Sequence, residues 1–173
     1  MPTVVTTPNR LTWANFVPGP AKILDPGDGT LVDALTEFDY HLLDLTSYSA
    51  NGIFTVPSEL VITITPRCKV WTGVTRTDKL LLHEHFHYDV GTMCARALAR
   101  HLKTLWATDR ATLAMHVEAA TKLHFKMRAD VIQKQYDIAT GHGTDSAQQH
   151  IWTWRMYSAL ANPDAAQICG YLF

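Results

Sequence analysis

The chain has 173 residues, of which 47% are hydrophobic and 18% charged, which is typical of a folded globular domain. Its 15 basic and 16 acidic side chains give a formal net charge of -1, so the basic surface that nucleic-acid binding requires is missing. No apolar run approaches the roughly 18 residues of a membrane span, and Met1 to Arg10 lacks the apolar region of a signal peptide. We expect a single domain over residues 1–173 without a nucleic-acid partner or membrane span. It would be cytoplasmic or a mature secreted form, and its oligomeric state is left open.

Residues 1–76 are predicted to consist mainly of strands and loops. Prolines and glycines recur through the first 60 residues and exclude long helices there. Val61 to Thr65 alternates in polarity and is rich in β-branched side chains, which predicts a strand. Lys69 to Val74 is a second candidate strand. Leu31 to Tyr48 could form a short helix or a further strand.

Residues 77–173 are predicted to be mainly helical. Apolar side chains recur at three- and four-residue steps from Thr77, a suitable N-cap, to about Trp106, which predicts one long helix. A second helix is predicted from Asp109 to about Ile138, where glycines follow. A third is predicted from Ser146 to about Leu160, opened by a capping box of Asp145 and Gln148.

The long helix contains an HExxH motif formed by His83, Glu84 and His87. Histidines four residues apart on a helix present both imidazoles on one face, where they can bind one ion. Glu84 is rotated by about 100° from His83, so it can take a proton from a water on the ion without being a ligand. Zinc suits imidazole ligands and lowers the pKa of such a water to about 7. The motif predicts a Zn²⁺ hydrolase, against the alternative of histidines that are merely hydrogen-bonded.

Two neighbouring residues qualify this prediction. His85 is rotated by about 200° from His83, so on a helix it should face away from the metal. On a strand, His83, His85 and His87 would share one face, as in a cupin-like iron or manganese site, but the helical periodicity argues against this. Gly91 would fit a close backbone approach beside the site, or it is an ordinary helix glycine that costs about 1 kcal/mol relative to alanine.

A third ligand must come from outside the motif. Val90 and Met93 occupy the positions of the glycine and the last histidine of HExxHxxGxxH, so that pattern is absent. The segment 135–143 is the most promising source, because it places a histidine between two glycines at a predicted helix end. The downstream candidates are Asp137, His142, Asp145 and His150.

Three segments resemble motifs of a bacterial family known as domain of unknown function 922, whose members are regarded as zinc-dependent proteases. Leu11 to Phe16 resembles the opening LTWxDF segment of the family, and Leu81 to Asp89 is similar to its LxHEQxHFD run. Tyr136 to Gly143 resembles its YDxxTxHG segment. The similarity spans most of the chain, which departs from the family pattern at Asn15, His85 and Ala139.

The resemblance implies a zincin-like α+β fold, in which a small N-terminal sheet packs on the HExxH helix and further helices follow. It implies zinc at His83 and His87, with Glu84 as general base. We predict His142 as the third ligand, with Asp137 as the alternative or as a carboxylate that orients a ligand histidine. Tyr136 could hydrogen-bond the oxyanion or be a buried core residue.

We therefore expect a zinc metallopeptidase in which Glu84 activates a zinc-bound water for attack on a peptide carbonyl. In zincins the edge strand beside the metal can bind an extended peptide, and Val61 to Thr65 and Lys69 to Val74 are the candidates. One alternative is an iron or manganese redox enzyme that uses the same histidines. Another is a non-catalytic binding domain that keeps the metal for stability.

Overall fold

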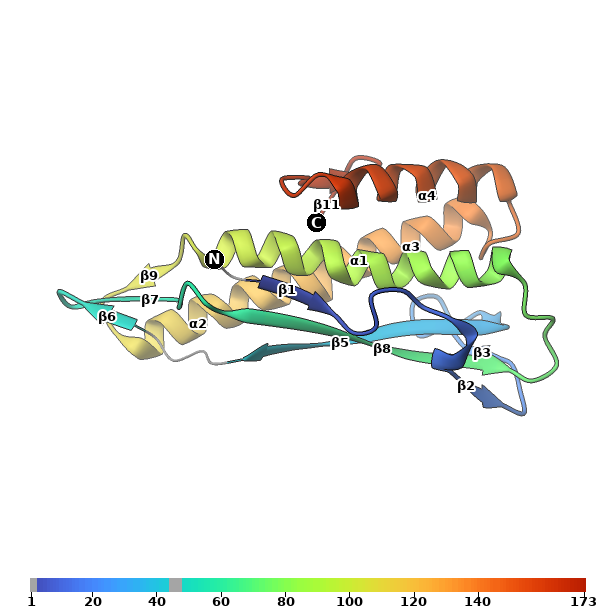
Figure 1. The fold of residues 1–173 in the computed structure, drawn as a ribbon, viewed down its shortest axis with the longest axis horizontal. Coiled ribbons are helices and arrows are strands. Elements are labelled where there is room, and N and C mark those ends of the chain that lie inside the picture. Colours follow the sequence, from blue (N-terminus) through green and yellow to red (C-terminus); the bar gives the residue numbers. More distant parts are fainter. Residues whose placement is uncertain (1–2, 44–47) are drawn as a thin grey trace.

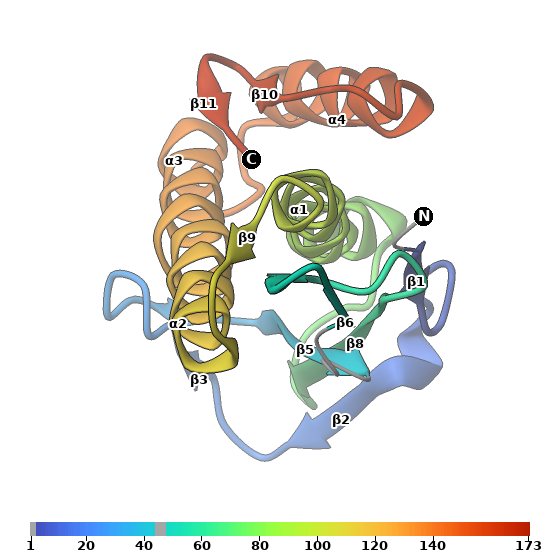
Figure 2. The same ribbon diagram turned by 90° about the vertical axis from the view of Figure 1, so that its left-hand side faces the viewer.

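The centre of the structure is α1 (Asp78–Leu102), which other elements surround on three sides. The computed structural model describes residues 3–43 and 48–173. Seen end-on in Figure 2, a sheet lies on one side of α1, the α2 to α3 rod lies on a second, and α4 lies on a third. The architecture is α+β, as predicted, and α1 runs along the length of the sheet (Figure 1).

The sheet is built around one long strand, β8 (Val61–Trp71). Along one edge it pairs antiparallel with β5 (Ala34–Leu43) over its residues 61–70. Its other edge pairs in parallel first with β1 (Thr3–Thr6) and then with β2 (Phe16–Gly19). Pro66 lies in the gap between β1 and β2, where its missing N–H costs no hydrogen bond on that edge.

The two strands predicted at 61–65 and 69–74 are therefore one strand, and it ends at Trp71. The uncertain segment from Leu31 to Tyr48 forms strands rather than a helix, with residues 44–47 outside the described part. β8 is paired on both edges, so the prediction that it supplies a free edge for a peptide was wrong. Among the described strands, β5 is the one whose second edge is open beside α3.

Short strands complete the fold. β3 (Ile23–Leu24) and β4 (Leu31–Val32) form a hairpin whose turn, residues 25–30, reaches the site described below. The remaining pairs are β6 (Tyr48–Ala50) with β7 (Ile53–Thr55), β7 with β9 (Trp106–Ala107), and β10 (Gln167–Ile168) with β11 (Tyr171–Leu172). A short 3₁₀ helix, η1 (Trp13–Asn15), precedes β2.

Thr77 caps α1 as predicted, because its hydroxyl accepts the N–H of Leu80. The helix ends at Leu102 instead of near Trp106, because Trp106 and Ala107 pair with β7 as β9. This difference comes from a contact distant in sequence, which the local apolar periodicity does not encode.

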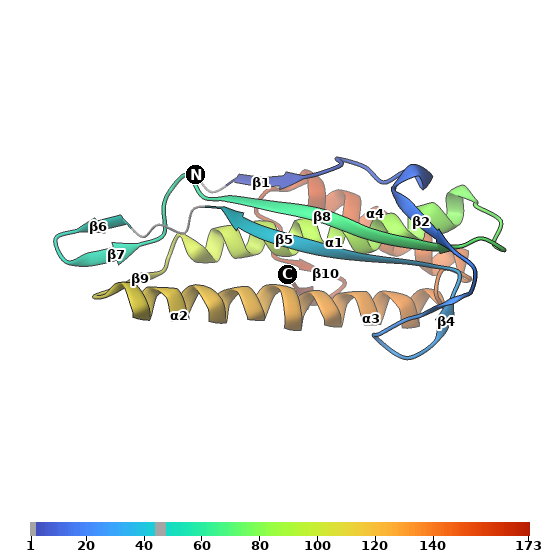
Figure 3. The ribbon, with the colours of Figure 1, turned by 90° about the horizontal axis from the view of Figure 1, so that it is seen from below.

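The second predicted helix is present as one continuous rod (Figure 3). It comprises α2 (Arg110–Thr121), a π-helical segment η2 (Lys122–Arg128) and α3 (Ala129–Thr140). Gly141 ends it in the left-handed conformation, with φ 54°. In α4 (Ser146–Ala161) the Asp145 carboxylate accepts two N–H groups, but the backbone N–H of Asp145 donates to Thr140, so only half of the predicted capping box forms.

The core lies on both sides of α1. Ile62, Ile64 and Val70 of β8 are buried beneath it, and Trp152 of α4 packs above. Gly91 lies where α1 crosses β5, and a Cβ there would be 2.9 Å from the Phe38 ring. The close approach that Gly91 suggested is therefore real. In the described residues, no helix is both long and apolar enough to cross a membrane.

Candidate metal centre

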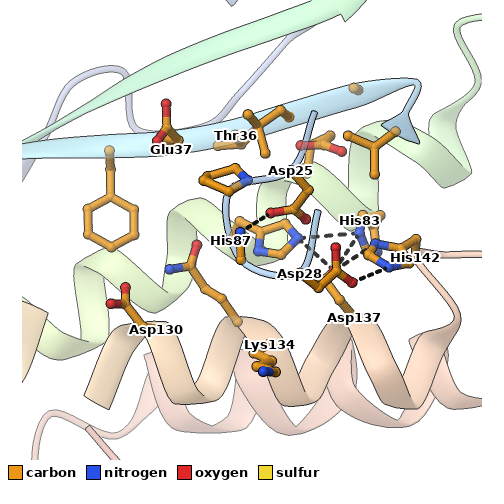
Figure 4. A pocket seen from close by; sticks show the side chains of 18 of the residues that line it. Asp25, Asp28, Thr36, Glu37, His83, His87, Asp130, Lys134, Asp137 and His142 are labelled. Carbon is orange, nitrogen blue, oxygen red and sulfur yellow. Dashed lines mark hydrogen bonds and ion pairs between the residues drawn. The ribbon is translucent and has the colours of Figure 1, made fainter. Parts of the chain in front are cut away.

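Three ligand atoms from two helices converge beside β5 (Figure 4). His83 and His87 face the same side of α1, one turn apart, and their Nε2 atoms are 3.3 Å apart. Asp137, near the end of α3, places its Oδ1 3.1 Å from Nε2 of His83 and 3.2 Å from Nε2 of His87. All three residues are buried, with at most 8% of their surface exposed. They lie close enough to bind one metal ion.

These separations fit the donor set of a small metal ion. Ligands about 2.0–2.1 Å from a tetrahedral zinc ion are separated from each other by about 3.3 Å. Asp137 Oδ1 is buried and makes no well-formed hydrogen bond, although both imidazoles lie near it. Two imidazole nitrogens and a carboxylate oxygen are expected to converge in this way, without a well-formed hydrogen bond to Oδ1, when all three atoms point toward the position of one metal ion.

Electrostatic interactions within the cluster shift the pKa values of Asp137 and His87 in opposite directions. Burial alone would raise the pKa of Asp137, but His87 and His83 outweigh it and hold that pKa well below its ordinary value. Burial alone would lower the pKa of His87, but the carboxylates of Asp137 and Glu84 raise it to about 9. Without a metal ion, His87 therefore carries a proton at neutral pH. A cation that replaces this proton meets a site already arranged for positive charge.

Glu84 lies next to this cluster in the same cavity but is not one of the three converging groups. It is 2% exposed, and burial raises its pKa, an effect that His83 and His87 partly offset. The Thr36 hydroxyl of β5 favours its charged form, while Oε2 has no hydrogen-bond partner in the described residues. Glu84 is thus a buried carboxyl group with an oxygen free to take a proton.

His142, the predicted third ligand, lies in the turn after α3. Its Nδ1 is 3.9 Å from Asp137 Oδ1, and its Nε2 is 3.1 Å from Asp28 Oδ2. His142 does not join the group formed by His83, His87 and Asp137, but it belongs to a second group with Asp25 and Asp137. Asp137, the alternative third ligand, is the residue that forms a possible metal-binding group with His83 and His87. Ligation by His142 stays a prediction.

Tyr136 is fully buried behind the histidines. Its ring stacks on His83 with centroids 4.7 Å apart and on Phe86 at 3.7 Å. It is not among the residues that line the cavity, and its hydroxyl has no well-formed hydrogen bond in the described part of the chain. This placement favours the core role over contact with substrate.

The remaining candidates lie outside the cluster. His85 faces away from it, as expected, with its Nδ1 3.1 Å from Asp89, and both residues border a separate hollow. Asp145 caps α4, and His150 is exposed on that helix. Neither lines the cavity that contains the histidine pair.

The wall of the site opposite α1 was not predicted from the sequence. A cavity of about 430 Å³ is bordered by residues 34–38 of β5 and by the turn at 25–28. Thr36, Asp25 and Asp28 reach the cluster from these two segments. This wall contains the segment Asp25-Pro26-Gly27-Asp28-Gly29-Thr30, from which the sequence predicted only that no long helix is present. Comparisons with protein-family models, curated proteins and solved structures found no match to this chain.

Proposed function

We propose that this protein is a zinc-dependent hydrolase with a zincin-like fold, and that its substrate is a peptide. The observation that carries the proposal is Glu84, a buried carboxyl group directly beside a His83, His87 and Asp137 cluster of metal-ligand geometry. Two histidines, one carboxylate and an unligated glutamate are the groups that a catalytic zinc site of this kind requires. The motif resemblances at Leu81 to Asp89 and Tyr136 to Gly143 point the same way, although no family model matches the chain.

The roles of the residues follow from their positions. A bound zinc ion would polarise a carbonyl group and acidify a water molecule at this site. Glu84 takes the proton of the attacking water and passes it to the leaving amine. Burial suits Glu84 to this work, because the raised pKa makes it a better proton acceptor than an exposed carboxylate. On the sheet side, the Thr36 hydroxyl counteracts part of the rise in the pKa of Glu84.

The open edge of β5 is suited to binding an extended peptide. β5 pairs with β8 on one side, and its residues 34–38 border the cavity on the other. A peptide added along this edge would receive backbone hydrogen bonds and pass beside His83, Glu84 and His87. We therefore assign to β5 the peptide-binding edge that the sequence had suggested for the two segments of β8.

A redox enzyme with iron is the second candidate. Two histidines and one carboxylate also form the ligand set of many non-haem iron oxygenases. That chemistry gives Glu84 no role, although burying a carboxyl group without full compensation is costly. Elemental analysis that finds iron, together with oxygen-dependent turnover, would favour this candidate over hydrolysis.

The test is Glu84→Gln, which keeps the shape of the side chain but removes the base. We expect zinc content to stay at the parental level while hydrolysis of a fluorogenic peptide library falls by about 10²–10⁴-fold. Glu37→Gln is the matched control, because Glu37 lines the same cavity but interacts with Arg67 rather than with the cluster. Turnover by Glu84→Gln at the parental rate would refute the general-base role.

A further inference from the structure

We propose that the cavity binds a second divalent cation beside the first, with Asp25 and His142 as ligands and Asp137 shared between the two ions. The inference rests on the metal centre of the proposed function and extends it to a two-metal site. Asp25, Asp137 and His142 form a second group whose ligand atoms all lie within 4.8 Å of one another. Because Asp137 belongs to both groups, the two positions are adjacent.

His142 has the arrangement of a metal ligand. Its Nε2 is 3.1 Å from Asp28 Oδ2 and 3.4 Å from the Thr30 hydroxyl, while Nδ1 faces Asp137 at 3.9 Å. With Nε2–H donating to Asp28, Nδ1 carries a lone pair that points into the site. A histidine ligand oriented by a carboxylate through its other nitrogen recurs in metal sites. Asp28 is then a positioning residue.

The backbone that carries His142 is specialised for this placement. His142 has φ 50°, in the left-handed region that histidine seldom adopts, and it lies between Gly141 and Gly143, which have φ 54° and 80°. A Cβ on Gly143 would be 3.1 Å from the His83 ring, so a glycine lets this turn pack against the first ligand. The turn thereby brings His142 to the mouth of the histidine pair.

Asp25 reaches the same position from the β3–β4 turn. Its Oδ1 accepts the N–H of Gly27 at 2.7 Å, which fixes the carboxylate and leaves its second oxygen for a ligand. Figure 4 shows Asp25, Asp28 and His142 gathered around Asp137 from two loops that are far apart in sequence.

The carboxyl groups around the site can accommodate a second cation. Four of them line the cavity near the histidine pair, which is more than the ligands of one ion require. They are Asp25, Asp28, Glu84 and Asp137. Asp137 is more than nine-tenths buried, and its Oδ1 lacks a well-formed hydrogen bond, so the shared carboxylate is the member that most needs a cation. In two-metal hydrolases, such a pair of ions is about 3.5–4 Å apart and clamps both the attacking and the leaving atoms.

The test counts ions without relying on activity. Protein stripped of metal is titrated with zinc in a calorimeter, and the ions retained after gel filtration are counted by mass spectrometry. We expect two ions per chain for the parent, and one for Asp25→Asn and for His142→Asn. Asparagine tolerates the left-handed conformation at position 142. Asp28→Asn should lower the affinity for the second ion by about 10–100-fold.

The control is Asp130→Asn, because Asp130 lies at the start of α3 and lines the same cavity away from the cluster (Figure 4). It should keep both ions. One ion in the parent, with the same count in all variants, would overturn this inference and leave the proposed function intact. No bound ion in the folded parent would overturn both. Circular dichroism of each variant shows that the fold is kept.

Discussion

Gly91→Ala tests how the distance between α1 and β5 is set. The new methyl group would meet three atoms of the Phe38 ring at 2.9 Å, and ordinary contact begins at 3.4 Å, so helix and strand must separate by about 0.5 Å. Phe125 of η2 packs against the Phe38 ring at a centroid distance of 6.1 Å and restrains the ring on that side. The substitution therefore moves β5 away from α1, and these two elements carry Thr36 and Glu84 respectively.

Two opposing effects determine the size of the change. Overpacking a core of this kind costs about 1–3 kcal/mol, whereas replacing glycine by alanine in a helix gains about 1 kcal/mol. We expect a net destabilisation of up to about 2 kcal/mol, which for a chain of this length lowers the melting temperature by up to about 8 °C. In a Phe38→Ala background the Cγ and Cδ atoms that the new methyl group would meet are gone, and Gly91→Ala should then stabilise by up to about 1 kcal/mol.

The assay is denaturant unfolding of the four proteins in this double-mutant cycle. Gly19→Ala serves as the control, because a Cβ at Gly19 meets nothing within 4 Å. Turnover should fall in Gly91→Ala while metal content is kept, since small displacements of a catalytic base are costly. Equal effects of Gly91→Ala in both backgrounds would refute the reasoning that Phe38 sets the distance.

Three further predictions concern protonation and packing. Because Asp137 and Glu84 raise the pKa of His87 to about 9, zinc binding near neutral pH should release about one proton, and affinity should fall as pH falls. Calorimetry in two buffers measures the release, and a value near zero would contradict the assignment of His87. Burial, Arg128 and His101 lower the pKa of His124 to about 4. Its contribution to stability is full above the unfolded pKa of about 6.5 and is lost as pH falls toward 4, so His124→Gln should flatten the acid side of the melting profile. Tyr136→Phe should keep zinc, turnover and stability within about 1 kcal/mol, because its hydroxyl has no well-formed partner. A 100-fold loss of turnover with zinc retained would instead place Tyr136 at the oxyanion.

The helices were predictable because their signals are local. Thr77, Asp109 and Asp145 all cap helices in the structure, each through a side-chain oxygen and a backbone N–H two or three residues on. The strands were less predictable, because β5 is defined by pairing with β8, whose partner residues lie between 18 positions (Leu43 with Val61) and 36 positions (Ala34 with Val70) later in the chain. The end of α1 was misplaced for the same reason, since β9 is held by β7 from the first half of the chain.

The same distinction between local signals and contacts distant in sequence applies to the candidate site. His83, Glu84 and His87 share one turn of helix, so their common position follows from helical geometry alone. Asp25, Asp28 and Thr36 come from a turn and a strand on the far side of the cavity. Nothing in the spacing of these residues places them near α1, because their approach depends on how the sheet packs against that helix.

The choice between His142 and Asp137 shows what ligand frequency leaves out. Histidine is the commoner zinc ligand, which favoured His142. Burial favours Asp137 beside the histidine pair, because Asp137 is 8% exposed and lies near two imidazoles without a well-formed hydrogen bond. A proton shared among His83, His87 and Asp137 could offset one charge, but Glu84 would remain beside it with Oε2 unpaired. A divalent cation offsets both carboxylates at once, so the cost of burying them is itself an argument for a metal ion at this position.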